Sequence, residues 1–181
     1  MANTYDHSIR AAERAVKIKR KVEQMLITDA NTPVSVMAQQ LGVSEAIFTG
    51  CLPAEMAKFT SGLHTETVLA ALPAWGNVTT IIANQGSLFE VKADFPPGKM
   101  ANGFYNLTGE QGQLTGHLRL DRISEIAFVC KPFRHMSSCY IAFFTARGEC
   151  VFKVYLGRDK QRQLFPQQVV QFQQLQQELC R

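Results

Sequence analysis

The sequence predicts an α+β protein in which N-terminal helices and a C-terminal helix pack with one large antiparallel β-meander sheet. Apolar residues recur at helical spacing up to Leu72, alternate with polar residues from Val78 to Gly157, and return to helical spacing after Pro166. With 181 residues, 46% of them apolar, the chain is long enough for one core. We therefore expect a single domain made of a helical segment (1–74, with 1–30 as an extension), a sheet region (75–165) and a final helix (166–181).

Four helices are expected before the sheet. The first runs from His7 to Thr28, with apolar residues on one side and Arg and Lys on the other, which we interpret as a solvated face. The second is capped by Thr32, has Pro33 in its first turn and carries Val34, Met37 and Leu41. Ser44 caps the third, and the fourth spans Thr65 to Leu72, just before a proline. The final helix presents an apolar stripe to the sheet through Val169, Phe172, Leu175 and Leu179.

The sheet region is rich in β-branched and aromatic residues, and Gly, Asn and Pro interrupt it about every 8 to 12 residues. This spacing is typical of an antiparallel meander. Seven strands are expected within residues 78–84, 87–95, 103–109, 112–120, 124–133, 138–148 and 149–157.

Charge and cysteine content restrict the function. The formal net charge is only +4, which is too small to require a nucleic-acid partner. The cysteines are odd in number and show no C-x-x-C spacing, so we expect neither a disulfide framework nor a zinc knuckle. We interpret this cysteine content as that of a protein in a reducing cytosol. No segment approaches the roughly 20 apolar residues of a membrane helix, and the N-terminus shows no apolar run of signal-peptide length, so we expect a chain that neither spans a membrane nor is exported by that route. The five cysteines are Cys51, Cys130, Cys139, Cys150 and Cys180.

The segment Val36–Pro53 has the length of a helix-turn-helix, the motif with which many proteins read DNA. Its second helix, 44–52, offers no Arg, Lys, Asn or Gln for bases or phosphates, and Glu45 would repel phosphate. We therefore expect this helix pair to pack beside the sheet and not to bind nucleic acid.

The chain has none of the common catalytic motifs, such as a P-loop, G-x-S-x-G, G-x-G-x-x-G or H-E-x-x-H. The stretch LTGHLRL is more informative, because strand alternation places His117 and Arg119 on one face. An imidazole can ligate a metal and a guanidinium can bind a carboxylate, and haem offers both an iron and two propionates. The alternative is a strand histidine that hydrogen-bonds a neighbour.

Three further segments stand out, WGNVTTI (75–81), GFYNLTGEQGQLTGHL (103–118) and YLGRDKQRQL (155–164). In their order and spacing they resemble the signatures of the HutX, HuvX and ChuX family of intracellular haem carriers. The resemblance implies a cytoplasmic, homodimeric, non-enzymatic carrier that receives imported haem b (hemin) and transfers it to a haem-degrading partner. Two alternatives stay open: an enzyme that degrades haem itself, and a haem-responsive helix-turn-helix regulator.

The resemblance also implies a ligand set. The histidine that family members use on the GH strand corresponds to His117, while a second histidine of some members corresponds to Ala83 here. The iron is therefore bound by His117 alone or with another ligand. Tyr105 is our leading candidate because a phenolate suits ferric iron, with Met100 as a weaker one. Tyr105 could equally be an aromatic packed in the sheet.

For the propionates, the plausible cations are Arg119, Lys99 and Arg134, each of which could instead be a solvated surface charge. Phe104 is expected to form a wall for the macrocycle, with Phe133 as a further candidate.

Overall fold

The computed structural model describes residues 2–84 and 86–180, with side chains from residue 12 onward. The α-helices are α1 (Ala2–Asp29), α2 (Val34–Leu41), α3 (Glu45–Gly50), α4 (Thr65–Ala71) and α5 (Pro166–Leu179), and three 3₁₀ turns are η1 (Gly62–His64), η2 (Leu72–Trp75) and η3 (Leu120–Arg122). The strands are β1 (Ala57–Ser61), β2 (Asn77–Asn84), β3 (Ser87–Asp94), β4 (Gly98–Ala101), β5 (Phe104–Leu107), β6 (Gly116–Leu118), β7 (Glu125–Cys130), β8 (Cys139–Phe144) and β9 (Cys150–Tyr155). The described helices include none long and apolar enough to cross a membrane.

The predicted α+β class with a large antiparallel sheet is confirmed, but the strands form two sheets instead of one. The larger sheet has the order β1-β7-β8-β9-β2-β3, and β4-β5-β6 form a separate three-stranded sheet. All seven predicted strands are present, whereas β1 and β4 were not predicted. The smaller sheet separates from the larger one because β4 follows Pro96 and Pro97, and neither proline can donate a backbone hydrogen bond to continue β3.

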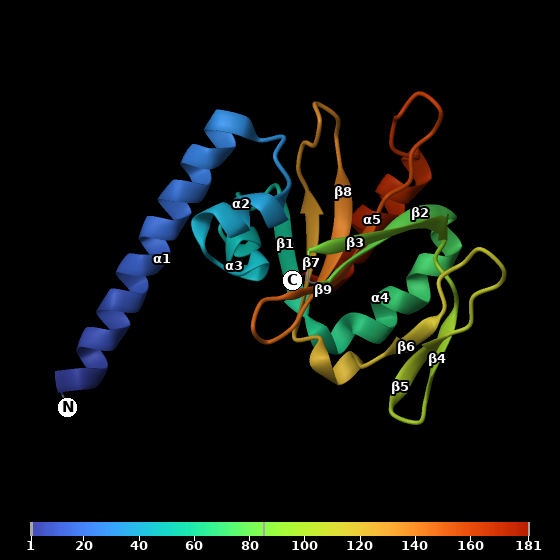
Figure 1. Ribbon diagram of the computed structural model, residues 1–181, viewed down its shortest axis with the longest axis horizontal. Coiled ribbons are helices and arrows are strands. Elements are labelled where there is room, and N and C mark those ends of the chain that lie inside the picture. Colours follow the sequence, from blue (N-terminus) through green and yellow to red (C-terminus); the bar gives the residue numbers. More distant parts are fainter. Residues whose placement is uncertain (1, 85, 181) are drawn as a thin grey trace.

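Helices cover the larger sheet on both faces (Figure 1). On one face, α4, α5 and the smaller sheet share a core with alternate residues of β7, β8 and β9, among them Phe128, Ile141, Phe143 and Val154. On the other face, α1, α2 and α3 pack on the intervening residues, among them Val129, Tyr140, Ala142 and Phe144. Burial on both faces explains why every residue of β8 is buried.

The helix pair α2–α3 packs against this second face. Ser44 caps α3 as predicted, since its Oγ accepts a hydrogen bond from the backbone N–H of Ile47 at 3.3 Å. Phe48 is fully buried, and the Glu45 carboxylate forms an ion pair with Lys153 of β9. Because α3 has six residues and turns Glu45 toward the sheet, it does not present the polar surface of a DNA-reading helix.

Helix α1 extends away from the body of the protein (Figure 1), and among its described side chains only Val22 is buried. Its basic residues from Arg14 to Lys21 are exposed, in agreement with the predicted solvated face. Arg10, which also belongs to this basic group, lies outside the described side chains.

The cysteine prediction is corrected. Cys130 and Cys139 face each other at the ends of β7 and β8 and form a disulfide. The sequence argument considered cysteine number and C-x-x-C spacing, and neither reveals a pair of residues that becomes adjacent only through the register of a hairpin. Cys51, Cys150 and Cys180 are free thiols.

Candidate functional site

The three-stranded sheet brings most of the predicted site residues to one surface. Its register places Asn106 of β5 between Lys99 of β4 and His117 of β6, so the three side chains share a face. Alternation along β5 adds Phe104 to the same face. We call the surface formed by Lys99, Phe104, Asn106, His117 and Arg119 the outer face.

Asn106 selects the tautomer of the His117 ring. Its Nδ2 donates to the carbonyl oxygens of Lys99, Ala101 and Phe104 at 3.3, 3.0 and 2.9 Å, so its Oδ1 is left to face His117 Nδ1 at 2.6 Å. An amide oxygen can only accept, and therefore Nδ1 carries the proton. In the neutral ring this tautomer leaves the lone pair on Nε2, the state in which an imidazole ligates a metal.

Phe104 lies between the imidazole and a guanidinium. Its ring centroid is 6.0 Å from that of His117, and the Cζ atom of Arg119 is 5.7 Å from the same ring. Arg119 binds Asp121 through Nε at 2.8 Å and Nη2 at 2.6 Å, which lowers the pKa of the Asp121 carboxyl. The Arg119 side chain stays 47% exposed, so a carboxylate from solution can reach it.

Tyr105 faces the opposite side of the sheet. It is paired with Met100 and Leu118, is only 2% exposed and belongs to the core shared with α4. Its ring lies against Gly98, where an added Cβ would be 2.4 Å from Tyr105 Cε1. Burial, and then the charge of Glu66, raise the pKa of the Tyr105 phenol. The structure thus does not bring Tyr105 or Met100 to the outer face with His117.

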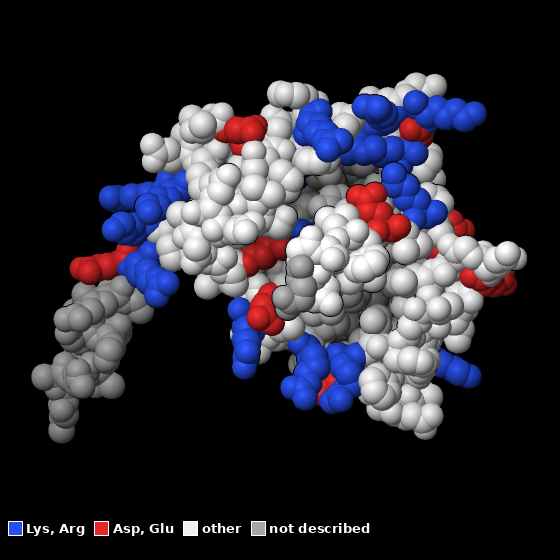
Figure 2. All heavy atoms as spheres, in the orientation of Figure 1, with Lys and Arg blue, Asp and Glu red and all other residues white. Residues whose placement is uncertain are grey.

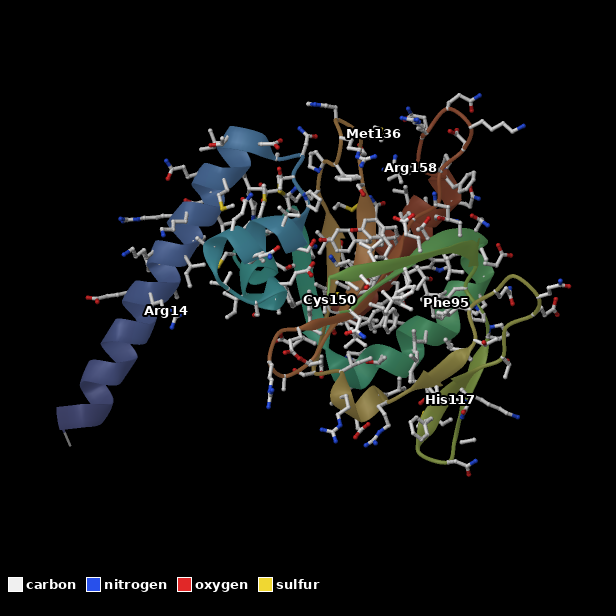
Figure 3. The ribbon with its side chains drawn as sticks, viewed as in Figure 1. Arg14, Phe95, His117, Met136, Cys150 and Arg158 are labelled. Atoms are coloured by element: carbon white, nitrogen blue, oxygen red, sulfur yellow. A yellow bond between two sulfur atoms is a disulfide. The ribbon has the colours of Figure 1, made fainter. Side chains whose placement is uncertain are left out.

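Arg134 also lies apart from this surface. It belongs to the loop 131–138 between β7 and β8, where its Cζ is 5.0 Å from the Phe133 ring centroid. Figure 3 shows Met136 of this loop and His117 at opposite ends of the molecule. Arg134 and Phe133 therefore do not join the outer face, because the hairpin carries them to the far end of the larger sheet.

Asn106 is the residue of this surface that the sequence analysis missed. The segment GFYNL drew attention to its aromatic residues, and an asparagine inside a strand is unusual enough to have been a signal. Its partner in β6 became visible only with the register of β5 and β6.

The fold and the outer face together define a class of protein. Its members are small α+β proteins that carry an exposed imidazole and nearby cations on a three-stranded sheet. The family described as "Haem utilisation ChuX/HutX" matches residues 59–175, and the chain belongs to this family. The intracellular heme transport protein HutX of Vibrio cholerae serotype O1 is 47% identical over 175 residues, which cover 96% of this chain and 91% of that protein.

Solved structures show the same fold. A crystal structure of a protein from Erwinia carotovora has a TM-score of 0.82 at 31% identity and covers 87% of this chain and 98% of its own. The structure of the heme binding protein ChuX has a TM-score of 0.78 at 29% identity and covers 87% of this chain and 97% of its own. The predicted family is thus confirmed.

Proposed function

We propose that the protein is an intracellular carrier that binds haem b on the outer face and transfers it to a haem-degrading partner. The observation that carries this proposal is the orientation of His117, whose Nε2 lone pair is kept free on an exposed surface beside Phe104 and Arg119. The HutX relative is named a haem transport protein, and ChuX a haem-binding protein, which supports haem as the cargo.

Each residue of the outer face has a task in this proposal. His117 Nε2 ligates the iron, and the Phe104 ring contacts the flat macrocycle. Arg119 and Lys99 bind the propionates, with Arg119 exchanging part of its contact with Asp121 for the incoming carboxylate. We infer a single axial ligand from this chain, since Tyr105 lies on the other face and Ala83 has no donor.

An exposed ligand suits delivery better than storage. A haem held on a sheet surface can be contacted by a second protein before it leaves the first. Titration of the full chain with hemin, followed by mixing with apomyoglobin as an acceptor, tests this directly. We expect one haem per chain and complete transfer; a complex that never releases haem to the acceptor would contradict carriage.

The enzyme alternative predicts a different outcome. Incubation of the hemin complex with ascorbate would give biliverdin-like products and loss of the Soret band if the protein opened the ring itself. We expect the Soret band to persist in the presence of catalase.

The regulator alternative is disfavoured by α3, which buries Phe48 and engages Glu45 with Lys153. We expect no gel shift on the upstream DNA of the gene, with or without hemin. A shift that appears only with hemin would support the regulator instead.

We further propose that the carrier acts in the cytosol as a homodimer, as the family resemblance implies. In a reducing cytosol the Cys130–Cys139 disulfide would be exposed to thiol exchange. Sedimentation equilibrium with and without dithiothreitol tests the dimer and its dependence on this bond. A monomer at all concentrations would contradict the assembly but not the haem site.

Replacement of Asn106 by leucine should lower haem affinity by about 10- to 100-fold, the usual effect of removing the group that orients a ligating histidine. Leucine keeps the size of the side chain but removes the acceptor that holds the proton on His117 Nδ1. Nitrogen NMR of the histidine ring, in the absence of haem, reports the tautomer separately. Asn84→Leu, at the exposed end of β2, is the matched control; unchanged affinity in Asn106→Leu with an altered tautomer would contradict ligation by His117.

Tyr105→Phe should change haem affinity by less than about twofold, because the phenol faces the core and its raised pKa disfavours the phenolate. The measurement is hemin titration with the visible spectrum recorded at saturation. A large loss of affinity, or loss of a phenolate charge-transfer band, would instead establish Tyr105 as the iron ligand.

A further inference from the structure

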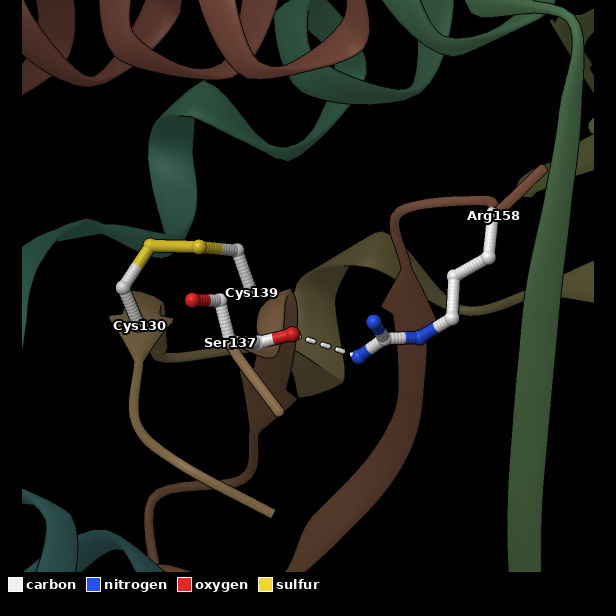
Figure 4. Close-up of a disulfide and its surroundings, with 4 residues drawn as sticks. All are labelled: Cys130, Ser137, Cys139 and Arg158. Carbon is white, nitrogen blue, oxygen red and sulfur yellow. Dashed lines mark hydrogen bonds between the residues drawn. A yellow bond between two sulfur atoms is a disulfide. The ribbon is translucent and has the colours of Figure 1, made fainter. Parts of the chain in front are cut away.

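A second candidate site lies at the opposite end of the molecule from His117. A cavity of about 630 Å³ opens between the loop 131–138, which joins β7 to β8, and the loop 156–165, which joins β9 to α5. The Cys130–Cys139 disulfide belongs to its lining, and Arg158 donates a hydrogen bond to the carbonyl oxygen of Ser137 at 2.5 Å (Figure 4). The haem proposal uses none of these residues.

The cations that line the cavity are Lys131, Arg158 and Arg162, and the imidazole of His135 lies beside them. The lining contains no Asp or Glu. Figure 2 shows Lys and Arg gathered over the position of these two loops. A cavity wall with one sign of charge and partly apolar surroundings concentrates the opposite charge, because the low dielectric of the protein weakens screening.

Backbone carbonyl groups, not carboxylates, hold the two least exposed of these cations. Arg158 also donates to the carbonyl oxygen of Arg162 at 2.8 Å, and Lys131 donates to the carbonyl oxygens of Ala30 and Thr32, the latter at 2.7 Å. The nearest acid to Lys131, Asp29, is hydrogen-bonded to Asn31 and Thr32. The ion pairs among the described side chains include none of these residues. Asp159, the acid of the loop 156–165, accepts a hydrogen bond from the backbone N–H of Gln163.

The backbone around the cavity is strained. Four described residues other than glycine have a positive φ, and three of them belong to these loops: Arg134 at 50°, His135 at 60° and Arg162 at 64°. A left-handed conformation is uncommon for such side chains and is concentrated at binding sites, where the surrounding structure holds it. His135 and Arg162, from two separate loops, both line this cavity, and Asn31 contacts the backbone N–H and the ring of His135.

We infer that this cavity binds an organic anion that carries a phosphate or carboxylate group. Arg162 and His135 at the mouth meet the oxyanion, and Arg158 supports it with a charge already fixed in place. Met136, Leu164 and Val169 form an apolar wall for the rest of the ligand. The volume exceeds what an inorganic oxyanion needs and lies within the range of small-molecule sites.

Calorimetric titration of the haem-free full chain with inorganic phosphate, citrate and ADP tests this inference at about 0.1 M salt, where surface charges are largely screened. We expect saturable binding of citrate or ADP that is weakened roughly tenfold in Arg162→Gln and restored in Arg162→Lys. Arg162 is suitable because its side chain is exposed and bonded to no described group, so the variant should fold. Arg147→Gln, at an exposed arginine in the turn between β8 and β9, is the matched control.

The three probes separate the possible sources of the anion. Binding of ADP and phosphate without citrate would identify a phosphate ligand, and binding of citrate alone a carboxylate ligand. Failure of all three to bind below about 10 mM, or equal loss of binding in Arg147→Gln, would overturn the inference. Since the assay contains no haem, its result does not depend on the proposed carrier function.

Discussion

Replacement of His117 by alanine is expected to lower the affinity for hemin more than about 100-fold. This loss is larger than the usual effect of removing only the residue that orients a ligating histidine. His117 is the outer-face residue whose nitrogen lone pair is held ready by a neighbour, through the 2.6 Å contact between its Nδ1 and Asn106 Oδ1. Its removal leaves Phe104 and the cations, which bind the macrocycle and propionates but not the iron. Hemin titration followed at the Soret band measures the loss.

The substitution should leave the fold intact, because the imidazole is exposed and its contacts are one hydrogen bond with Asn106 and a T-shaped contact with the Phe104 ring. His64→Ala and His135→Ala are matched controls, since neither residue lies on the outer face, and both should bind hemin like the unmodified protein. External imidazole should restore part of the spectrum of His117→Ala by occupying the vacated position. Unchanged affinity in His117→Ala would remove the basis of the proposed site.

Replacement of Lys153 by methionine is expected to destabilise the protein by about 3 kcal/mol, the typical cost of breaking a buried ion pair from one side. The side chains of Lys153 and Glu45 are only 11% and 13% exposed, and Lys153 Nζ is 5.4 Å from the Tyr140 ring centroid. Loss of the ammonium leaves the Glu45 carboxylate buried without a partner. Urea unfolding measures the change, and Lys58→Met, at an exposed lysine of β1, should alter the free energy of unfolding far less.

The same pair predicts how stability depends on pH. Burial is the largest single effect on Lys153 and disfavours its charged form, but the charges of Glu45, Tyr155 and Cys150 and the hydrogen bond to Glu45 together outweigh it, so the pKa of the lysine is raised above 10.5. A raised pKa in the folded state means that this contribution is complete at neutral pH and is lost only as the pH rises through the folded value. The free energy of unfolding should therefore fall more steeply with rising alkaline pH in the unmodified protein than in Lys153→Met. Identical pH profiles of the two proteins would show that the pair does not contribute.

Local patterns predicted most of the fold. Helical spacing predicted α4 and α5, and alternation predicted β2, β3 and β5 to β9, because those segments bury one regular set of side chains. The strand β1 was missed since it has five residues inside a helical segment and pairs with β7, more than sixty residues later. The division into two sheets depends on long-range pairing of β2 with β9, which no local pattern contains.

The candidate site was predictable only in part. Alternation placed His117 and Arg119 together, and the structure adds Phe104 and Lys99 to the same surface. Alternation within one strand cannot say which residues of other strands share that surface. Tyr105 was chosen because a phenolate suits ferric iron, and Asn106 was not considered, although a shift of one position along β5 moves a side chain to the opposite face.

A crystal structure of the hemin complex, with the iron located from its anomalous scattering, tests the central claim most directly. Our account predicts a single strong peak within bonding distance of His117 Nε2, with the macrocycle on Phe104 and a propionate at Arg119. A peak on the Tyr105 side of the smaller sheet, or in the cavity beside Arg158, would contradict it.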